Sequence, residues 1–169
     1  MIVSHHARIV ILLGVAGSGK TTIGQLLAKD LNWGFHDGDD FHPKANVDKM
    51  SQGIALSDED RDAWLAALDG VIRHLISSAQ SAVIACSALK QRYRDRLAAD
   101  RTEVVFAYLK GGYDLTHERL VSRKDHFMKA DLLASQFDTL EEPEGVLSID
   151  IAQEPAIILD QIKQALGLA

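Results

Sequence analysis

The residues from Gly14 to Thr21 constrain the fold of this chain more than any other segment. They read Gly-Val-Ala-Gly-Ser-Gly-Lys-Thr, which matches the phosphate-loop pattern of a glycine, four arbitrary residues, Gly-Lys and a hydroxyl residue. The apolar run Ile9–Leu13 precedes the loop, and apolar residues at helical spacing follow it. A strand, a glycine-rich turn and a helix in this order predict a phosphate-binding βα unit.

The residue types in this loop indicate how each would bind a nucleotide. Glycines let successive N–H groups point at phosphate oxygens, and the positive end of the following helix attracts the same anions. We expect Lys20 to neutralise the terminal phosphates and the Thr21 hydroxyl to bind Mg²⁺. The expected nucleotide-binding residues of this segment are Gly14, Gly17, Ser18, Gly19, Lys20, Thr21 and Thr22.

Short β-branched runs alternate with longer stretches of helical periodicity along the rest of the chain. This alternation predicts an α/β fold with a parallel sheet and crossover helices. Ser57 and Asp60 have the spacing of a capping box and start the best-marked helix. Further helices are expected near residues 89–99, 113–123 and 155–166. The expected strands are Ile9–Leu13, Gly34–Asp37, Ala82–Cys86, Val104–Leu109 and Val146–Ile149.

Composition limits the partners and the compartment. The 169 residues include 18 Lys plus Arg and 24 Asp plus Glu, a net charge of −6, which predicts no binding to nucleic acid or to an anionic membrane. The single cysteine, Cys86, cannot form an internal disulfide and is expected in the core, which favours a reducing cytoplasm. No apolar run reaches the roughly 18 residues of a transmembrane helix. We expect one domain over residues 1–169.

The segment at about 123–143 departs from the α/β pattern, because basic and aromatic residues lie there between two α/β units. A segment of this kind is typical of a lid that closes over a site. Its apolar members equally fit a small satellite core. Those members are Phe127, Leu132, Leu133 and Phe137.

A phosphate loop alone does not separate a kinase from a nucleotide-dependent switch. Switches and motors usually carry an acid at the end of a second apolar strand, whereas Ser87 follows Ala82–Cys86 here. The acids follow the short second strand instead, in the run from Asp37 to Pro43. A carboxylate at that edge of the sheet can accept the proton of an attacking hydroxyl or hold a metal through water.

Several further motifs resemble the gluconate kinase family over nearly the whole chain from Ile9 onward. Early ones are Asp37-Gly-Asp-Asp-Phe-His42-Pro43, Asn46-Val-Asp-Lys49-Met50, Leu56-Ser-Asp58-Glu-Asp60-Arg61 and Trp64-Leu65. Later ones are Cys86-Ser87-Ala88-Leu89-Lys90, Tyr93-Arg94-Asp95, Tyr108-Leu109-Lys110-Gly111, Arg119-Leu120, His126-Phe127, Ser135-Gln136-Phe137 and Leu140-Glu141.

The resemblance implies a three-layer P-loop kinase fold similar to those of shikimate and adenylate kinases. It implies a five-stranded parallel sheet with helices on both faces and a small helical lid. The implied reaction is transfer of a phosphoryl group from ATP to the 6-hydroxyl of D-gluconate, giving ADP and 6-phosphogluconate. Members of the family are often homodimers. A kinase of another small hydroxy acid, such as shikimate, and a nucleotide-dependent switch remain the alternatives.

Site roles follow from the resemblance and from the chemistry of an anionic polyol. Asp39 is expected to orient or deprotonate the 6-hydroxyl, with Asp40 as the second choice. Arg123, at the start of the lid-like segment, is expected to reach the transferring phosphoryl group, with Arg119 assisting at the nucleotide. The catalytic set is therefore Lys20, Asp39 and Arg123. The expected gluconate-binding residues are Asp39, His42, Arg61, Ser87, Lys90 and Arg94.

Overall fold

The computed structural model describes residues 6–123 and 131–168, and its centre is one sheet. All neighbouring strands are parallel, in the order β2-β3-β1-β4-β5, which confirms the predicted five-stranded parallel sheet. Three strands differ from the expected bounds by one residue. The strands are β1 (Ile9–Leu13), β2 (Gly34–Asp37), β3 (Ala82–Ala85), β4 (Val104–Lys110) and β5 (Leu147–Asp150).

Strand β1 occupies the middle of the sheet because it is apolar at every position. All five of its residues are buried, as expected for a strand covered on both faces. Ile11 pairs in register with Ile84 of β3 on one side and with Phe106 of β4 on the other. The phosphate loop therefore starts from the buried central strand of the sheet.

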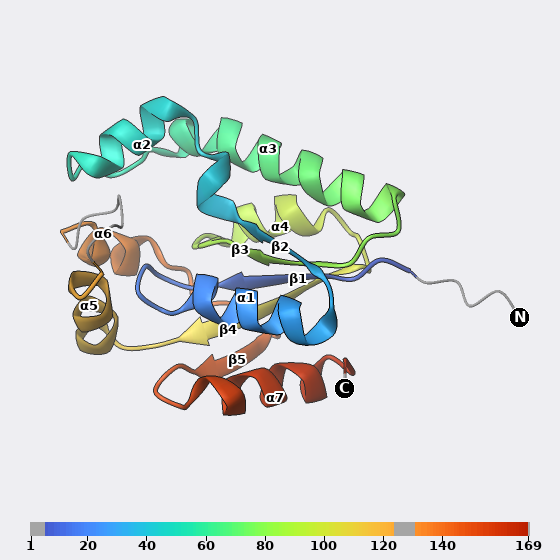
Figure 1. The fold of residues 1–169 in the computed structure, drawn as a ribbon. Coiled ribbons are helices and arrows are strands. Elements are labelled where there is room, and N and C mark those ends of the chain that lie inside the picture. The colour runs from blue at the N-terminus through green and yellow to red at the C-terminus, as the bar shows by residue number, and fades with distance from the viewer. Residues whose placement is uncertain (1–5, 124–130, 169) are drawn as a thin grey trace, which may run out of the picture.

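Helices cover both faces of the sheet and form the outer layers (Figure 1). On one face, Ile9 and Ile11 pack against a core that includes Trp64 and Leu68 of α3. On the other face, Val10 and Leu12 pack with residues of α1 and α7. The helices are α1 (Lys20–Leu31), α2 (Lys44–Ser51), α3 (Asp58–Ser77), α4 (Gln91–Ala98), α5 (Tyr113–Val121), α6 (Leu132–Thr139) and α7 (Pro155–Ala165).

The start of α3 is fixed by the capping box that the sequence predicts. The Ser57 hydroxyl accepts from the Asp60 N–H at 3.2 Å, and the Asp60 carboxylate accepts from the Ser57 N–H at 2.9 Å. Lys49 donates to the same carboxylate at 2.8 Å, and these bonds lower the pKa of Asp60 to about 2. Because such a cap holds the first turn in place, Arg61 projects from a defined position.

The carboxyl ends of the parallel strands meet at one edge of the sheet, away from the two chain ends (Figure 1). The phosphate loop follows β1 there, a short 3₁₀ helix (Gly38–Phe41) follows β2, and Ser87 comes shortly after β3. This is the edge at which open α/β sheets bind ligands. Within the described ranges, no helix combines the length and the apolar character needed to cross a membrane.

Candidate active site

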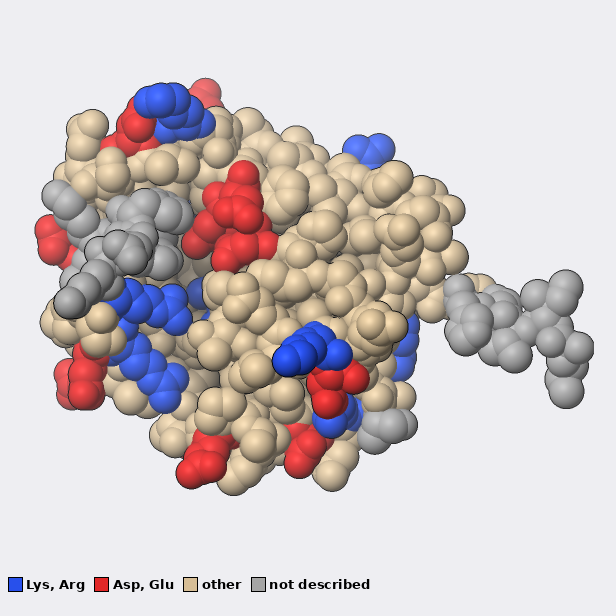
Figure 2. Space-filling model, viewed as in Figure 1, with Lys and Arg blue, Asp and Glu red and all other residues tan. Residues whose placement is uncertain are grey.

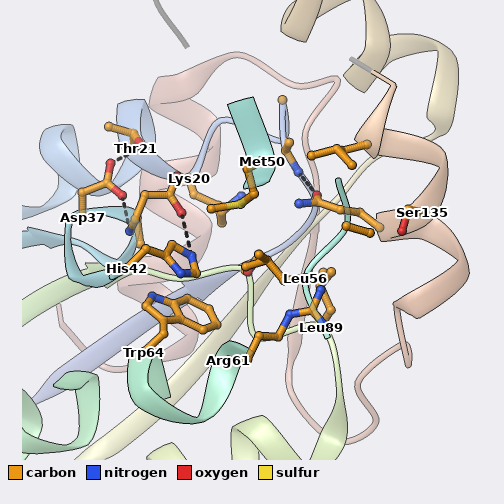
Figure 3. A pocket seen from close by; sticks show the side chains of 18 of the residues that line it. Lys20, Thr21, Asp37, His42, Met50, Leu56, Arg61, Trp64, Leu89 and Ser135 are labelled. Carbon is orange, nitrogen blue, oxygen red and sulfur yellow. Dashed lines mark hydrogen bonds and ion pairs between the residues drawn. The ribbon is translucent and has the colours of Figure 1, made fainter. Parts of the chain in front are cut away.

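One cavity at this edge joins the phosphate loop to the segments that follow β2 and β3. Figure 3 shows side chains from separate elements pointing into it, including Lys20, His42, Met50, Leu89 and Ser135. In Figure 2, acidic and basic side chains face one another across a hollow at the end of the molecule where α2, α5 and α6 lie. Of the predicted site residues, the cavity is lined by Gly17, Gly19, Lys20, Thr21, Asp39, His42, Arg61, Ser87 and Arg123.

The phosphate loop owes its shape to glycines with left-handed backbone angles. Gly17 has a φ of 77°, and a Cβ placed on it would lie 2.3 Å from the Thr116 carbonyl oxygen. Lys20 closes the loop by donating to the Val15 carbonyl at 2.8 Å. Burial lowers the pKa of Lys20, Asp39 opposes that shift, and the positive charge of Arg123 adds to it. Lys20, Asp39 and Arg123, the three predicted catalytic residues, thus line one cavity.

Asp37 is a site residue that the sequence-based assignment missed. Its carboxylate accepts from the Thr21 hydroxyl at 2.8 Å and from the Asp39 N–H at 3.0 Å, and Figure 3 shows the Thr21 bond. It therefore ties the start of α1 to the acid-bearing turn after β2. Its position as the last residue of the second strand is the signal that could have identified it.

Asp39 and Asp40 differ in their placement, although they are adjacent in the sequence. The Asp39 side chain lines the cavity and is 31% exposed, whereas Asp40 is exposed and does not line the cavity. Asp39 is thus the acid that can reach a bound acceptor.

His42 is held between Trp64, Asn46 and Asp39. Its ring stacks on Trp64 with centroids 4.4 Å apart, and the Trp64 indole donates to the Gly38 carbonyl at 2.7 Å. The Asn46 amide nitrogen lies 3.4 Å from His42 Nδ1 and can only donate. This contact favours the tautomer in which Nδ1 accepts and Nε2, which lies 4.0 Å from Asp39 Oδ1, carries the proton. The ring is positioned to donate toward the acid-bearing turn.

The buried ring of His42 predicts a pH-dependent stability. Burial, helped by the charge of Arg61, lowers the pKa of His42 to about 4, whereas the unfolded chain titrates near 6.5. Between these values the unfolded state binds the extra proton, so the contribution of His42 to stability falls as the pH drops from about 6.5 to about 4. The shift corresponds to at most about 3 kcal/mol.

We expect His42→Gln to remove this part of the pH dependence. Urea unfolding of the parent protein and of His42→Gln at pH 7, 5.5 and 4 checks it, because other groups titrate alike in both. Between pH 7 and pH 4 the free energy of unfolding should fall further in the parent protein than in His42→Gln. Parallel pH profiles would contradict the assignment.

Arg61 projects into the cavity from the first turn of α3. Its side chain is 15% exposed, its guanidinium donates to the Tyr93 hydroxyl at 3.3 Å, and it lies 4.0 Å from Asp58. Tyr93 in turn donates to Asp58, which also pairs with Arg92 and with Lys90. Arg61 is thus a held, mostly covered cation on the side of the cavity away from α1.

Lys90 and Arg94 were expected to bind the substrate, but neither residue lines the cavity. Lys90 forms an ion pair with Asp58 at 3.0 Å. Arg94 is buried and donates to the carbonyl oxygens of Ala88 at 2.8 Å and Glu141 at 2.8 Å. It therefore clamps the turn after β3, where Ala88 has a left-handed φ of 41°, to the segment after α6. In this structure Arg94 braces the cavity wall, and its role as a substrate ligand stays a prediction.

Other expected nucleotide-binding residues also lie outside the lining of the cavity. Gly14 and Ser18 are buried within the phosphate loop, and Thr22 is exposed on α1. Arg119 donates to the Ile151 carbonyl at 2.9 Å and does not line the cavity. These residues support or flank the loop in the structure.

The described part of the lid-like segment contains α6, which packs on the phosphate loop. Leu133 is fully buried in a cluster with Val15, Ala16 and Leu120, against which Phe137 also packs. Phe127 lies outside the described residues. The Gln136 side-chain oxygen accepts from the Ala16 N–H at 2.6 Å. The sequence predicts no role for Gln136, because the residues around it do not indicate a partner that lies so far away along the chain.

The chain is similar to known proteins in both sequence and fold. A profile of the shikimate kinase family matches residues 16–144. The thermosensitive gluconokinase of Escherichia coli is 45% identical over 159 residues, covering 92% of this chain and 85% of the relative. A sugar kinase from Janibacter sp. has a TM-score of 0.90 at 37% identity, with 96% of each chain covered. A gluconokinase from Sinorhizobium meliloti has a TM-score of 0.83 at 38% identity, covering 96% of this chain and 93% of that one.

Proposed function

The chain belongs to the shikimate kinase family of P-loop kinases and, within it, to the gluconokinases, and we propose that it phosphorylates D-gluconate. The reaction moves the terminal phosphoryl group of ATP to the 6-hydroxyl and yields ADP and 6-phosphogluconate. The observation that carries the proposal is a single cavity in which a phosphate loop, the Asp39 carboxylate and the covered cation Arg61 converge. Relatives named gluconokinase match over most of the chain.

On the nucleotide side, we assign the triphosphate to the phosphate loop. Backbone N–H groups and Lys20 carry the charge that phosphate oxygens need, and the N-terminus of α1 adds its positive end. The positive charge of Arg123 contributes to the lowered pKa of Lys20. We therefore propose that Arg123 neutralises charge on the phosphoryl group during transfer.

The residues around Thr21 fit a magnesium ion. The Thr21 hydroxyl donates its proton to Asp37, which leaves the oxygen lone pairs of Thr21 available to a hard cation. The described residues contain no group of three or more His, Cys, Asp or Glu that could hold a metal alone, which suits an ion that takes other ligands from phosphate and water. When bound, Mg²⁺ neutralises charge on the phosphate oxygens.

On the acceptor side, we assign Asp39 to the reacting hydroxyl and Arg61 to the carboxylate of gluconate. Asp39 accepts the proton of the 6-hydroxyl as that oxygen attacks phosphorus. The His42 Nε2–H donates a hydrogen bond either to the acid-bearing turn or to a hydroxyl of the substrate. Arg61 is the cation for the carboxylate at the other end of gluconate, because its planar fork matches carboxylate geometry. Ser87 supplies a further hydroxyl at the wall of the cavity.

The direct test of this function is ADP release with Mg-ATP and a panel of acceptors. The panel contains gluconate, related sugar acids, shikimate, nucleosides and no acceptor, with Lys20→Ala as the blank. Release that depends on gluconate supports the proposal. ADP release with shikimate alone would mean that shikimate, and not gluconate, is the acceptor. ADP release that is independent of every acceptor would favour a nucleotide-dependent switch.

Removing the charge of Arg61 should weaken gluconate binding more than catalysis. We expect Arg61→Met to raise KM for gluconate about 30-fold, since a charge-assisted hydrogen bond contributes about 2 kcal/mol. Initial rates at varied gluconate and saturating Mg-ATP measure it. Arg73→Met is the control, because Arg73 is an exposed residue on the same helix. An unchanged KM in Arg61→Met would contradict the assignment of Arg61 to the gluconate carboxylate.

A cytoplasmic location and a homodimeric assembly remain predictions from composition and from the family resemblance. No binding of nucleic acid or of a membrane surface is part of the proposal.

A further inference from the structure

Helix α6 contacts segments from both halves of the cavity. At its start, Leu132 packs with Met50 and Leu56 in a small buried cluster. Met50 lies in α2, which begins shortly after His42, and Leu56 precedes the turn of α3 that carries Arg61. The first turn of α6 is therefore packed on the segments that present the acceptor-binding side chains.

The same helix holds the phosphate loop. Leu133 packs with Val15 and Ala16, and the Gln136 side-chain oxygen accepts from the Ala16 N–H at 2.6 Å. Ala16 and Gln136 both line the cavity, as does Ser135, which Figure 3 shows on α6. A main-chain amide of the phosphate loop thus bonds to a side chain of a helix whose first turn also packs on the acceptor segments.

We propose that Gln136 is a positioning residue that couples the acceptor segments to the phosphate loop. Packed elements shift as units, so closure of the α2 and α3 segments on an acceptor moves α6 and, through Gln136, the Ala16 amide. Acceptor binding then strengthens nucleotide binding, and nucleotide binding strengthens acceptor binding by the same factor. The proposal rests on the proposed function, because gluconate is the acceptor used to test it.

The test compares nucleotide affinity with and without acceptor in matched variants. Gln136→Met keeps the length of the side chain but removes the hydrogen-bond acceptor. Gln136→Glu keeps an oxygen acceptor. Thr139→Val is the control because, among the described residues, the Thr139 hydroxyl bonds to the Ser135 carbonyl within α6 and to no other group. Isothermal titration gives Kd for the Mg²⁺ complex of a non-hydrolysable ATP analogue, in the absence and presence of saturating gluconate.

In the parent protein and in Thr139→Val, we expect gluconate to lower the nucleotide Kd at least about fivefold. In Gln136→Met the ratio of the two Kd values should fall close to one. Gln136→Glu should keep the parent ratio, even if its negative charge raises both Kd values. A purely structural role for the Gln136 side chain would not predict that the ratio is lost in Gln136→Met and kept in Gln136→Glu. A parent ratio of one, or a parent-like ratio in Gln136→Met, would overturn the proposal.

Failure of this coupling is distinguishable from failure of the proposed function. If the parent protein releases ADP on gluconate but shows no coupling, the function stands and the inference about Gln136 is wrong. If another acceptor drives ADP release, the titrations are run with that acceptor and the same ratios decide. A protein that responds to no acceptor overturns both.

Discussion

We expect Asp39→Asn to lower kcat/KM for gluconate about 10³-fold, because a positioned general base contributes roughly 10²–10⁴-fold. Asparagine keeps the size of the side chain but cannot accept the proton of the 6-hydroxyl. The Asp39 N–H bond to Asp37 involves the backbone, so the turn should stay in place. Nucleotide affinity should therefore change little, and steady-state kinetics with titration of Mg-ADP measures both effects.

Asp40→Asn is the matched control for this prediction. Asp40 is adjacent, carries the same charge and is exposed outside the cavity, so its loss should change kcat/KM by no more than about twofold. An Asp39→Asn enzyme within tenfold of the parent would remove Asp39 from the role of base. Equal losses in the two variants would show that net charge near the site, rather than proton acceptance, is what matters.

The second large effect is expected at Lys20. Lys20→Met should lower kcat about 10²–10³-fold, the loss typical when one preorganised stabilising group is removed from a transition state. It should also weaken nucleotide binding, because the Lys20 charge faces the phosphates. ADP release at saturating gluconate and titration with Mg-ADP measure the two effects.

Lys29→Met controls for the loss of a lysine from the same helix. Lys29 is exposed in the last turn of α1, far along the helix from the loop. Its replacement should leave kcat within about twofold. Near-normal turnover in Lys20→Met would contradict the assignment of the triphosphate to this loop.

The sheet and most helices could be predicted because their signals are local. Ile9–Leu13 is apolar throughout, and the alternation of strands and helices defines a parallel sheet without knowledge of contacts. The expected bounds of β3, β4 and β5 differ by one residue from those found, since strand ends depend on neighbouring strands. The capping box at Ser57 fixed the start of α3 correctly.

The site could be predicted only in part, because some roles depend on partners distant in the sequence. Arg94 was expected to bind an anion, yet its acceptor at Glu141 lies 47 positions away. One signal was available, since Tyr93, Arg94 and Leu97 share the buried face of α4. Gln136 belongs to the family-like Ser135-Gln136-Phe137 motif, but that motif does not indicate its partner Ala16, which is 120 positions away.

The most direct test of the account is the phosphorus NMR spectrum of the product formed from Mg-ATP and gluconate by the parent enzyme. Transfer to the 6-hydroxyl esterifies the one primary alcohol of gluconate, so the phosphorus couples to two protons. We expect a phosphate monoester triplet that appears with ADP at a one-to-one ratio and that forms about 10²–10³-fold more slowly with Lys20→Met. A doublet, which marks a secondary hydroxyl, or inorganic phosphate as the only product would contradict it.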